Sequence, residues 1–195
     1  MAPRKRIIKE DILAGAVRVI QHAGPSALSV RNIAGELGCS TQPLYSEFRN
    51  VEQLQEELLP YIREKYLLGK YSSYKEFGRT FLRFAREEQA LFQFLYLRQR
   101  NPEERLLDDV NGETTVALLS RNLEMTMAEA WEMHQRMQNY CYGLGVMIAI
   151  HYRAMDQEES DRELTEFYSI LLRHYKKITS EEELQYWLDR SRNLL

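Results

Sequence analysis

A short stretch near the start of the 195-residue chain gathers side chains that form hydrogen bonds without carrying charge. The positions that would face outward are Thr41, Gln42, Pro43, Tyr45 and Ser46. A glutamine amide can pair with adenine in bidentate fashion, and hydroxyl groups tolerate several base edges. These residue types predict a surface that reads DNA bases, with Tyr45 better suited to a phosphate than to a base.

Residues on either side of this stretch suit the DNA backbone. Ser29 and Arg31 stand at the expected start of a preceding helix, where unpaired N–H groups favour a phosphate. Ser40 is expected to cap the reading helix, with Pro43 tolerated in its first turn. The predicted DNA-binding residues are therefore Ser29, Arg31, Ser40, Thr41, Gln42, Pro43, Tyr45, Ser46 and Arg49.

Two short helices joined by a tight turn would position these side chains. Apolar residues at 30, 33, 34 and 37 follow the i, i+3, i+4, i+7 spacing of a helix face, and Gly38 suits the turn that ends it. Leu44 and Phe48 would bury one side of the second helix. This is the pattern of a helix-turn-helix. The alternative is a helical hairpin in an unrelated bundle, which has no need for Ser40, Tyr45 and Phe48 together.

The stretch from Ser29 to Phe48 resembles the DNA-binding domain of TetR-family transcriptional regulators. Its form is S-V-R-x-I-A-x-x-L-G-x-S-x-x-x-L-Y-x-x-F, and the matching positions are Ile33, Ala34, Gly38, Ser40, Leu44, Tyr45 and Phe48. The resemblance implies a regulator, usually a repressor, that binds a palindromic operator as a homodimer and is released by a small molecule. One departure is residues 50–52, Asn-Val-Glu, where the family usually places a phosphate-binding lysine. Arg49 is expected to take that contact.

The rest of the chain is predicted to be helical, giving an all-α protein. Apolar residues recur every three to four positions, and the sequence has only 9 Gly and 5 Pro. We expect a DNA-binding domain at 1–50 and an effector-binding and dimerisation domain at 51–195. Helix 51–68, kinked at Pro60, would connect them. The other expected helices span about 9–22, 73–87, 89–98, a stretch from 101, 112–122, 126–154, 160–177, and 180 to the end.

Charge is divided along the chain in a way that suits contact with nucleic acid at one end. The first 50 residues carry seven basic and four acidic side chains, and the remaining 145 carry 19 and 25. Arg4, Lys5 and Arg6 would lie near phosphates or form an inert, disordered tail. The alternative is ordinary variation of surface charge, so the charge distribution supports the helix-turn-helix without establishing it.

Two sets of residues in the second domain are candidates for regulation. Aromatic and methionine side chains could line an adaptable apolar pocket for an effector, or simply form core; they are Phe81, Phe84, Met133, Met137, Tyr140 and Met147. Apolar residues of two late helices are candidates for a homodimer interface; they are Tyr142, Val146, Ile150, Phe167, Ile170 and Leu171. A TetR-like DNA-binding protein without a small-molecule effector is the alternative.

Other classes of function receive little support. The sequence has no glycine-rich phosphate loop, HExxH motif or nucleophile elbow, so we expect no catalytic residue and no cofactor. Cys39 and Cys141 lack metal-ligand spacing, which predicts free thiols and a cytoplasmic protein. No apolar run is long enough for a signal peptide or a membrane span.

Overall fold

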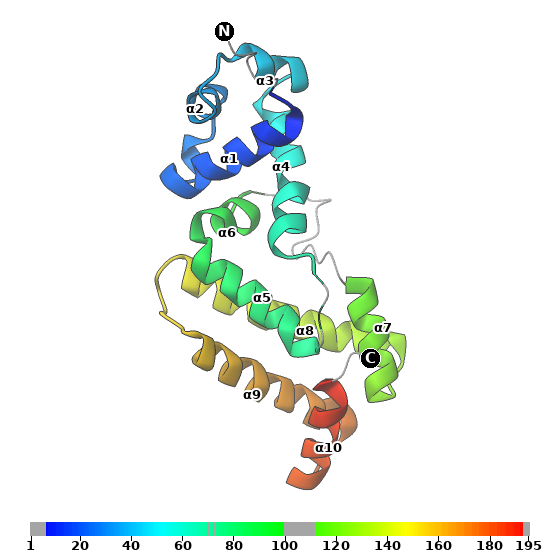
Figure 1. Ribbon diagram of the computed structural model, residues 1–195. Helices are drawn as coiled ribbons and strands as arrows, with labels where there is room; N and C mark the ends of the chain where they lie inside the picture. Colours follow the sequence, from blue (N-terminus) through cyan, green and yellow to red (C-terminus); the bar gives the residue numbers. More distant parts are fainter. Residues whose placement is uncertain (1–6, 70, 72, 100–111, 193–195) are drawn as a thin grey trace. The chain divides into compact units, whose positions relative to one another are not determined.

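The computed structural model describes residues 7–69, 71, 73–99 and 112–192, which fold into helices without a strand (Figure 1). The elements in chain order are α1 Lys9–Ala23, the 3-10 turn η1 Pro25–Ala27, α2 Val30–Glu36, α3 Gln42–Glu47, α4 Val51–Tyr66, α5 Tyr74–Glu87, α6 Gln89–Tyr96, α7 Gly112–Leu123, α8 Met127–Ala149, α9 Gln157–Lys176 and α10 Glu181–Arg192. The all-α prediction is confirmed. The helix expected from Asn101 and the basic tail at residues 4–6 lie outside the described residues.

The first of two compact units is built around α1. It contains the chain up to Tyr66 together with Glu88–Gln99, so that α4 and α6 belong with the first three helices. α1 packs against α2, α3, α4, α6 and η1. The side chains that fill this unit are fully buried; they include Ile12, Ile20, Ile33, Leu44, Leu54, Leu58, Ile62, Leu91, Phe92 and Leu95. The functional boundary expected at residue 50 stays a prediction, although α4 packs with the helices that precede it.

The second unit is built around α8. The long helix packs against α5, α7 and α9, and α10 covers parts of α5, α7 and α9. Thr126 begins α8 through a capping box, since its hydroxyl accepts from the N–H of Glu129 and that carboxylate accepts from Thr126. The predicted capping pair is confirmed. α8 ends at Ala149, five residues before the predicted end, and His151 follows with a φ of 59°.

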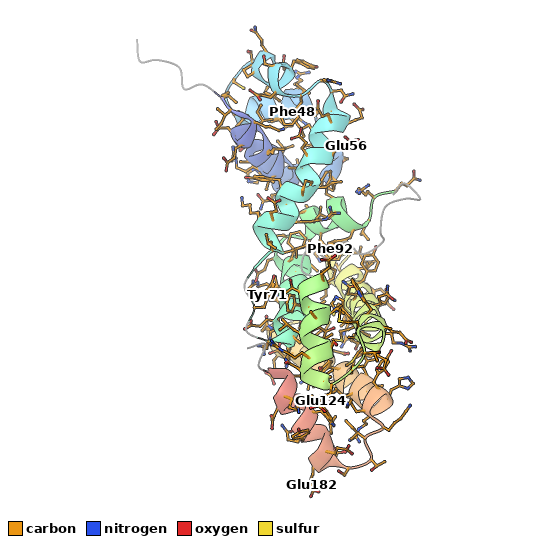
Figure 2. All side chains as sticks on the ribbon, turned by 90° about the vertical axis from the view of Figure 1, so that its right-hand side faces the viewer. Phe48, Glu56, Tyr71, Phe92, Glu124 and Glu182 are labelled. Atoms are coloured by element: carbon orange, nitrogen blue, oxygen red, sulfur yellow. The ribbon has the colours of Figure 1, made fainter. Side chains whose placement is uncertain are left out.

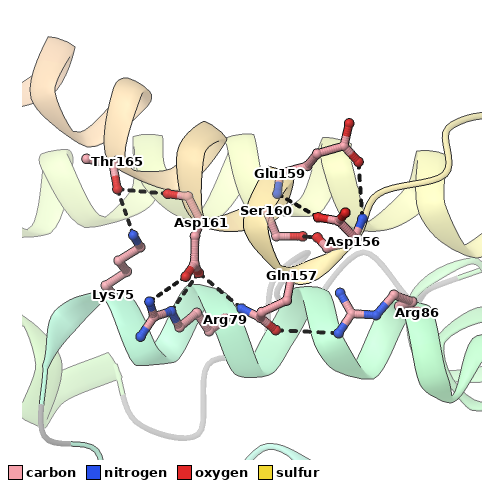
Figure 3. A network of polar contacts seen from close by, with 9 residues as sticks. All are labelled: Lys75, Arg79, Arg86, Asp156, Gln157, Glu159, Ser160, Asp161 and Thr165. Atoms are coloured by element: carbon pink, nitrogen blue, oxygen red, sulfur yellow. Dashed lines mark hydrogen bonds and ion pairs between the residues drawn. The ribbon is translucent and has the colours of Figure 1, made fainter.

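Polar side chains hold α5 and α9 antiparallel in the second unit (Figure 3). Arg79 forms a bidentate ion pair with Asp161, with Nε–Oδ1 and Nη2–Oδ2 distances of 2.6 and 2.5 Å. Lys75 donates to Thr165 at one end of the row, and Arg86 to the Gln157 amide at the other. A planar guanidinium facing a carboxylate fixes the register of the two helices along their axes.

The predicted N-cap of α9 is wrong by four residues. We expected Ser160 and Glu163 to cap a helix over 160–177, but Asp156 is the N-cap and forms a capping box with Glu159. Ser160 lies inside the first turns, 1% exposed, and its hydroxyl donates to the carbonyl of Asp156. Burial of Ser160 therefore requires the helix to start one turn earlier.

Candidate nucleic-acid interface

The two helices of the predicted reader form where their apolar residues find the core. Ile33 and Ala34 of α2, and Leu44 and Phe48 at α3, are all buried. A helix of six residues such as α3 is not stable alone, so packing must hold it. Burial of side chains like Leu44 and Phe48 contributes roughly 1.5–3 kcal/mol each. Figure 2 marks Phe48 near the start of α4.

Local hydrogen bonds fix the start of α2 and the turn after it. Ser29 accepts from the N–H of Asn32 at 3.2 Å, which confirms it as the N-cap. The Asn32 side chain donates to the carbonyl of Ala27 and ties α2 to η1. Gly38 has a φ of 63°, as predicted, and the N–H of Cys39 closes the turn on Ala34. α2 also lies close to α1, because a Cβ added at Gly15 would be 3.0 Å from Leu37.

The buried side of α3 determines which side chains face out. Thr41, Gln42, Tyr45 and Ser46 are exposed, and Tyr45 is 60% exposed. Pro43 is half-buried in the first turn. In the described part of the chain the side chains of Thr41, Gln42 and Tyr45 form no hydrogen bond. Their donors and acceptors are therefore available to a partner in solution.

Two exposed guanidinium groups belong to segments next to α3 in the chain. Arg31 lies on the first turn of α2, and Arg49 lies between α3 and α4. Both are exposed, and neither forms a side-chain ion pair with any residue the structure describes. The backbone of Arg49 is held, because its N–H donates to Gln53 while Asn50 caps α4 through the N–H of Gln53. A free guanidinium on a fixed backbone suits a phosphate.

Two details of the prediction need correction. Ser40 is not the N-cap of α3; the N-cap is Thr41, which makes no side-chain cap hydrogen bond. Ser40 is exposed, so its hydroxyl can face a ligand instead. Ser46 is exposed as predicted, but its hydroxyl donates to the carbonyl of Gln42 at 3.1 Å. Ser46 thus offers a partner its acceptor positions more readily than its proton.

Sequence reasoning missed two acidic residues at this interface. Glu47 ends α3, is exposed, and places a negative charge beside the uncharged face. Glu36 ends α2, and its Oε1 forms an ion pair with Nε of Arg18 on α1 at 2.6 Å. The other carboxylate oxygen of Glu36 lies 4.0 Å from Nδ1 of His22. The charge of Glu47 was visible in the sequence, whereas the partner of Glu36, 18 residues away, was not.

The candidate effector residues divide into two groups. Phe84, Met133 and Met137 are buried, and Phe81 and Met147 are half-buried, on the paired helices α5 and α8. Tyr140 instead contacts α9. Its ring stacks on that of Phe167 with the ring centroids 4.0 Å apart, and its hydroxyl donates a hydrogen bond to Glu163. Burial and this carboxylate raise the pKa of Tyr140. The Tyr140 and Arg153 hydrogen bonds in turn lower the pKa of Glu163.

The candidate dimer-interface residues differ in how far they are exposed to solvent. Ile150, the C-cap residue of α8, is 50% exposed, and Ile170 on α9 is 61% exposed. Tyr142, Val146 and Phe167 are half-buried. Leu171 is buried within the subunit, so it is core in a single chain.

A comparison with known families finds a match that covers the interface. Residues 12–58 match the family described as bacterial regulatory proteins, tetR family. The matched range runs from the first buried residue of α1 to the middle of α4 and includes both helices of the reader. A comparison with curated proteins gives no significant match. Among the described residues no helix has the length and apolar character to cross a membrane, and no cluster of three His, Cys, Asp or Glu side chains is placed to hold a metal ion.

Proposed function

We propose that this TetR-family DNA-binding transcriptional regulator is a repressor that binds a palindromic operator as a homodimer and is released by a small molecule. The observation that carries the operator proposal is the exposed face of α3. The side chains of Gln42 and Thr41 form no hydrogen bond with the described residues, and Arg31 of α2 and Arg49 after α3 are exposed and form no ion pair with those residues. Gln42 would read bases in the major groove, while Arg31 and Arg49 would hold the backbone.

Homodimer formation is supported by features of α8 and α9 that the single chain does not explain. Gly143 lies in the interior of α8, is exposed, and a Cβ added there would meet nothing within 4 Å. An interior glycine costs a helix up to about 1 kcal/mol relative to alanine. A second copy of α8 lying close to Gly143 would account for the glycine and would cover Ile150 and Ile170.

An apolar effector is supported by the residues on α5 and α8. Phe81, Phe84, Met133, Met137 and Met147 provide aromatic and flexible thioether side chains in one helix pair. Release would follow if the effector binds the conformation with lower DNA affinity more tightly. Tyr140, already bonded to Glu163 and stacked on Phe167, is the least suited of the predicted set.

Selection of bound fragments from random DNA tests the operator proposal. The full chain should enrich a palindrome with two half-sites related by a two-fold axis. A single unpaired half-site would contradict dimeric reading, and no enrichment would contradict sequence-specific binding. A reporter with the selected site across its promoter then separates repression from activation. Apolar compounds that weaken operator binding and raise the Tm of the chain would support the effector.

A further inference from the structure

The side-chain amide of Gln21 joins two points that are distant in the sequence. Gln21 lies in the last turn of α1, and its Nε2 donates to Tyr66 Oη at 3.2 Å and to Glu88 Oε2 at 2.7 Å. An amide nitrogen carries two hydrogens, so one group can serve both acceptors. All three residues belong to the first unit.

The two acceptors stand where the chain passes between the units. Tyr66 is the last residue of α4, after which the chain enters the second unit. Glu88 is the residue at which it returns to the first unit, immediately before α6. Both ends of the intervening segment, which contains α5, are therefore bonded to the same side chain of α1.

The chemistry of both acceptors fits this arrangement. Glu88 occupies the N-cap position of α6 but makes no side-chain cap hydrogen bond, and its carboxylate bonds to Gln21 instead. Burial, followed by the charge of Glu88, raises the pKa of Tyr66. The phenol is neutral at pH 7, and its oxygen accepts a hydrogen from the amide nitrogen of Gln21, which can only donate.

We propose that Gln21 is a positioning residue that couples the segment between Tyr66 and Glu88 to the DNA-binding helices. α1 packs against α2 and α3, so a displacement of Tyr66 or Glu88 that keeps its hydrogen bond acts on the helices of the reader. The inference rests on the proposed function, since it assigns one side chain to the route by which the second unit controls DNA binding.

Amide hydrogen exchange on the full chain tests whether Gln21 holds both points. Gln21→Met keeps the length of the side chain and removes both donors. We expect exchange to become about 3- to 10-fold faster at the end of α4 and at the start of α6, as loss of one or two hydrogen bonds would give. Gln55→Met is the matched control on α4, because the Gln55 side chain forms no hydrogen bond with the described residues. Unchanged exchange at both points in Gln21→Met would overturn the proposal.

The same experiment with a DNA duplex selected by the wild-type chain tests the coupling. DNA should slow exchange in residues 73–87 of the wild type and of Gln55→Met, but not of Gln21→Met. Gln21→Lys should restore the effect, because its ammonium group can donate to both acceptors. Persistence of the DNA effect in Gln21→Met, or its absence in the wild type, would overturn the coupling role. A wild-type chain that binds no DNA would overturn the proposed function and the coupling with it. The exchange measured without DNA would then decide separately whether Gln21 holds the two points.

Discussion

The exposed face of α3 and the α5–α9 pair both carry polar side chains in rows, but they use them differently. In the α5–α9 row, Lys75, Arg79 and Arg86 bond to side chains of the facing helix (Figure 3). On the α3 face, Gln42 and Tyr45 bond to no other side chain in the part of the chain that the structure describes. Polar groups that satisfy one another stabilise the fold, while groups left with only water as partner are available for recognition. The two rows should therefore respond oppositely to substitution.

The largest expected effect is on DNA preference at the α3 face. Gln42→Ala should reduce operator affinity by about 1–3 kcal/mol and leave non-specific binding nearly unchanged, because it removes a base contact only. Arg31→Ala is the comparison variant and should weaken both kinds of binding, because phosphates are the same in every sequence. Competition gel shifts with and without random DNA measure both quantities. Equal losses in the two variants would contradict a base-reading role for Gln42.

Removing a cation of the α5–α9 row should affect stability and leave DNA preference unchanged. Arg79→Met should lower the free energy of unfolding by about 0.5–1 kcal/mol, a discounted value because the Arg79 side chain is 40% exposed. Arg83→Met is the matched control on the same helix, since Arg83 is exposed and forms no ion pair with the described residues. Urea unfolding should separate the two variants. A similar loss in both would mean that the row does not stabilise the second unit.

Acid should weaken the same row. The hydrogen bonds from Arg79 lower the pKa of Asp161 in the folded protein. A lowered carboxyl pKa contributes stability above the unfolded value of about 3.9, and this contribution is lost as pH falls through the folded value. The stability difference between the wild type and Arg79→Met should thus be constant from pH 7 to about pH 5 and shrink below pH 4. Urea midpoints at pH 7, 5 and 3.5 would reveal it, and a constant difference at all three would contradict the assignment.

The same contrast explains what the sequence could predict. The α2–α3 face depends on residues within twenty positions: apolar spacing, the Ser29 cap and the Gly38 turn are all local signals, and each is found in the structure. The α5–α9 row joins residues 71, 82 and 90 positions apart, and no local pattern pairs them. The bonds of Gln21, which span 45 and 67 positions, were invisible for the same reason.

The errors within helices arose where local signals competed. Asp156 with Glu159 and Ser160 with Glu163 both have the spacing of a capping box, and only burial of Ser160 in the second unit selects the first. At α3, Ser40 and Thr41 are both good N-cap residues, and the helix starts after Thr41 without a side-chain cap. Local chemistry offered two possible N-cap residues in each case and could not decide between them.

The smallest expected effect is within the α3 face itself, between a side chain that already forms a hydrogen bond in the folded chain and side chains that form none. The hydroxyl of Ser46 already donates to the carbonyl of Gln42. Ser46→Ala should therefore change operator affinity by less than about 0.5 kcal/mol, although Ser46 and Gln42 are both exposed. Thr41→Ala is the comparison variant, because the Thr41 hydroxyl has no such bond within the described chain. Gel shifts on the selected operator should rank the losses as Gln42, then Thr41, then Ser46. A loss of affinity in Ser46→Ala as large as that in Gln42→Ala would mean that the Ser46 hydroxyl leaves the carbonyl of Gln42 and bonds to a base. An exposed hydrogen bond to the backbone would then not exclude a side chain from DNA recognition.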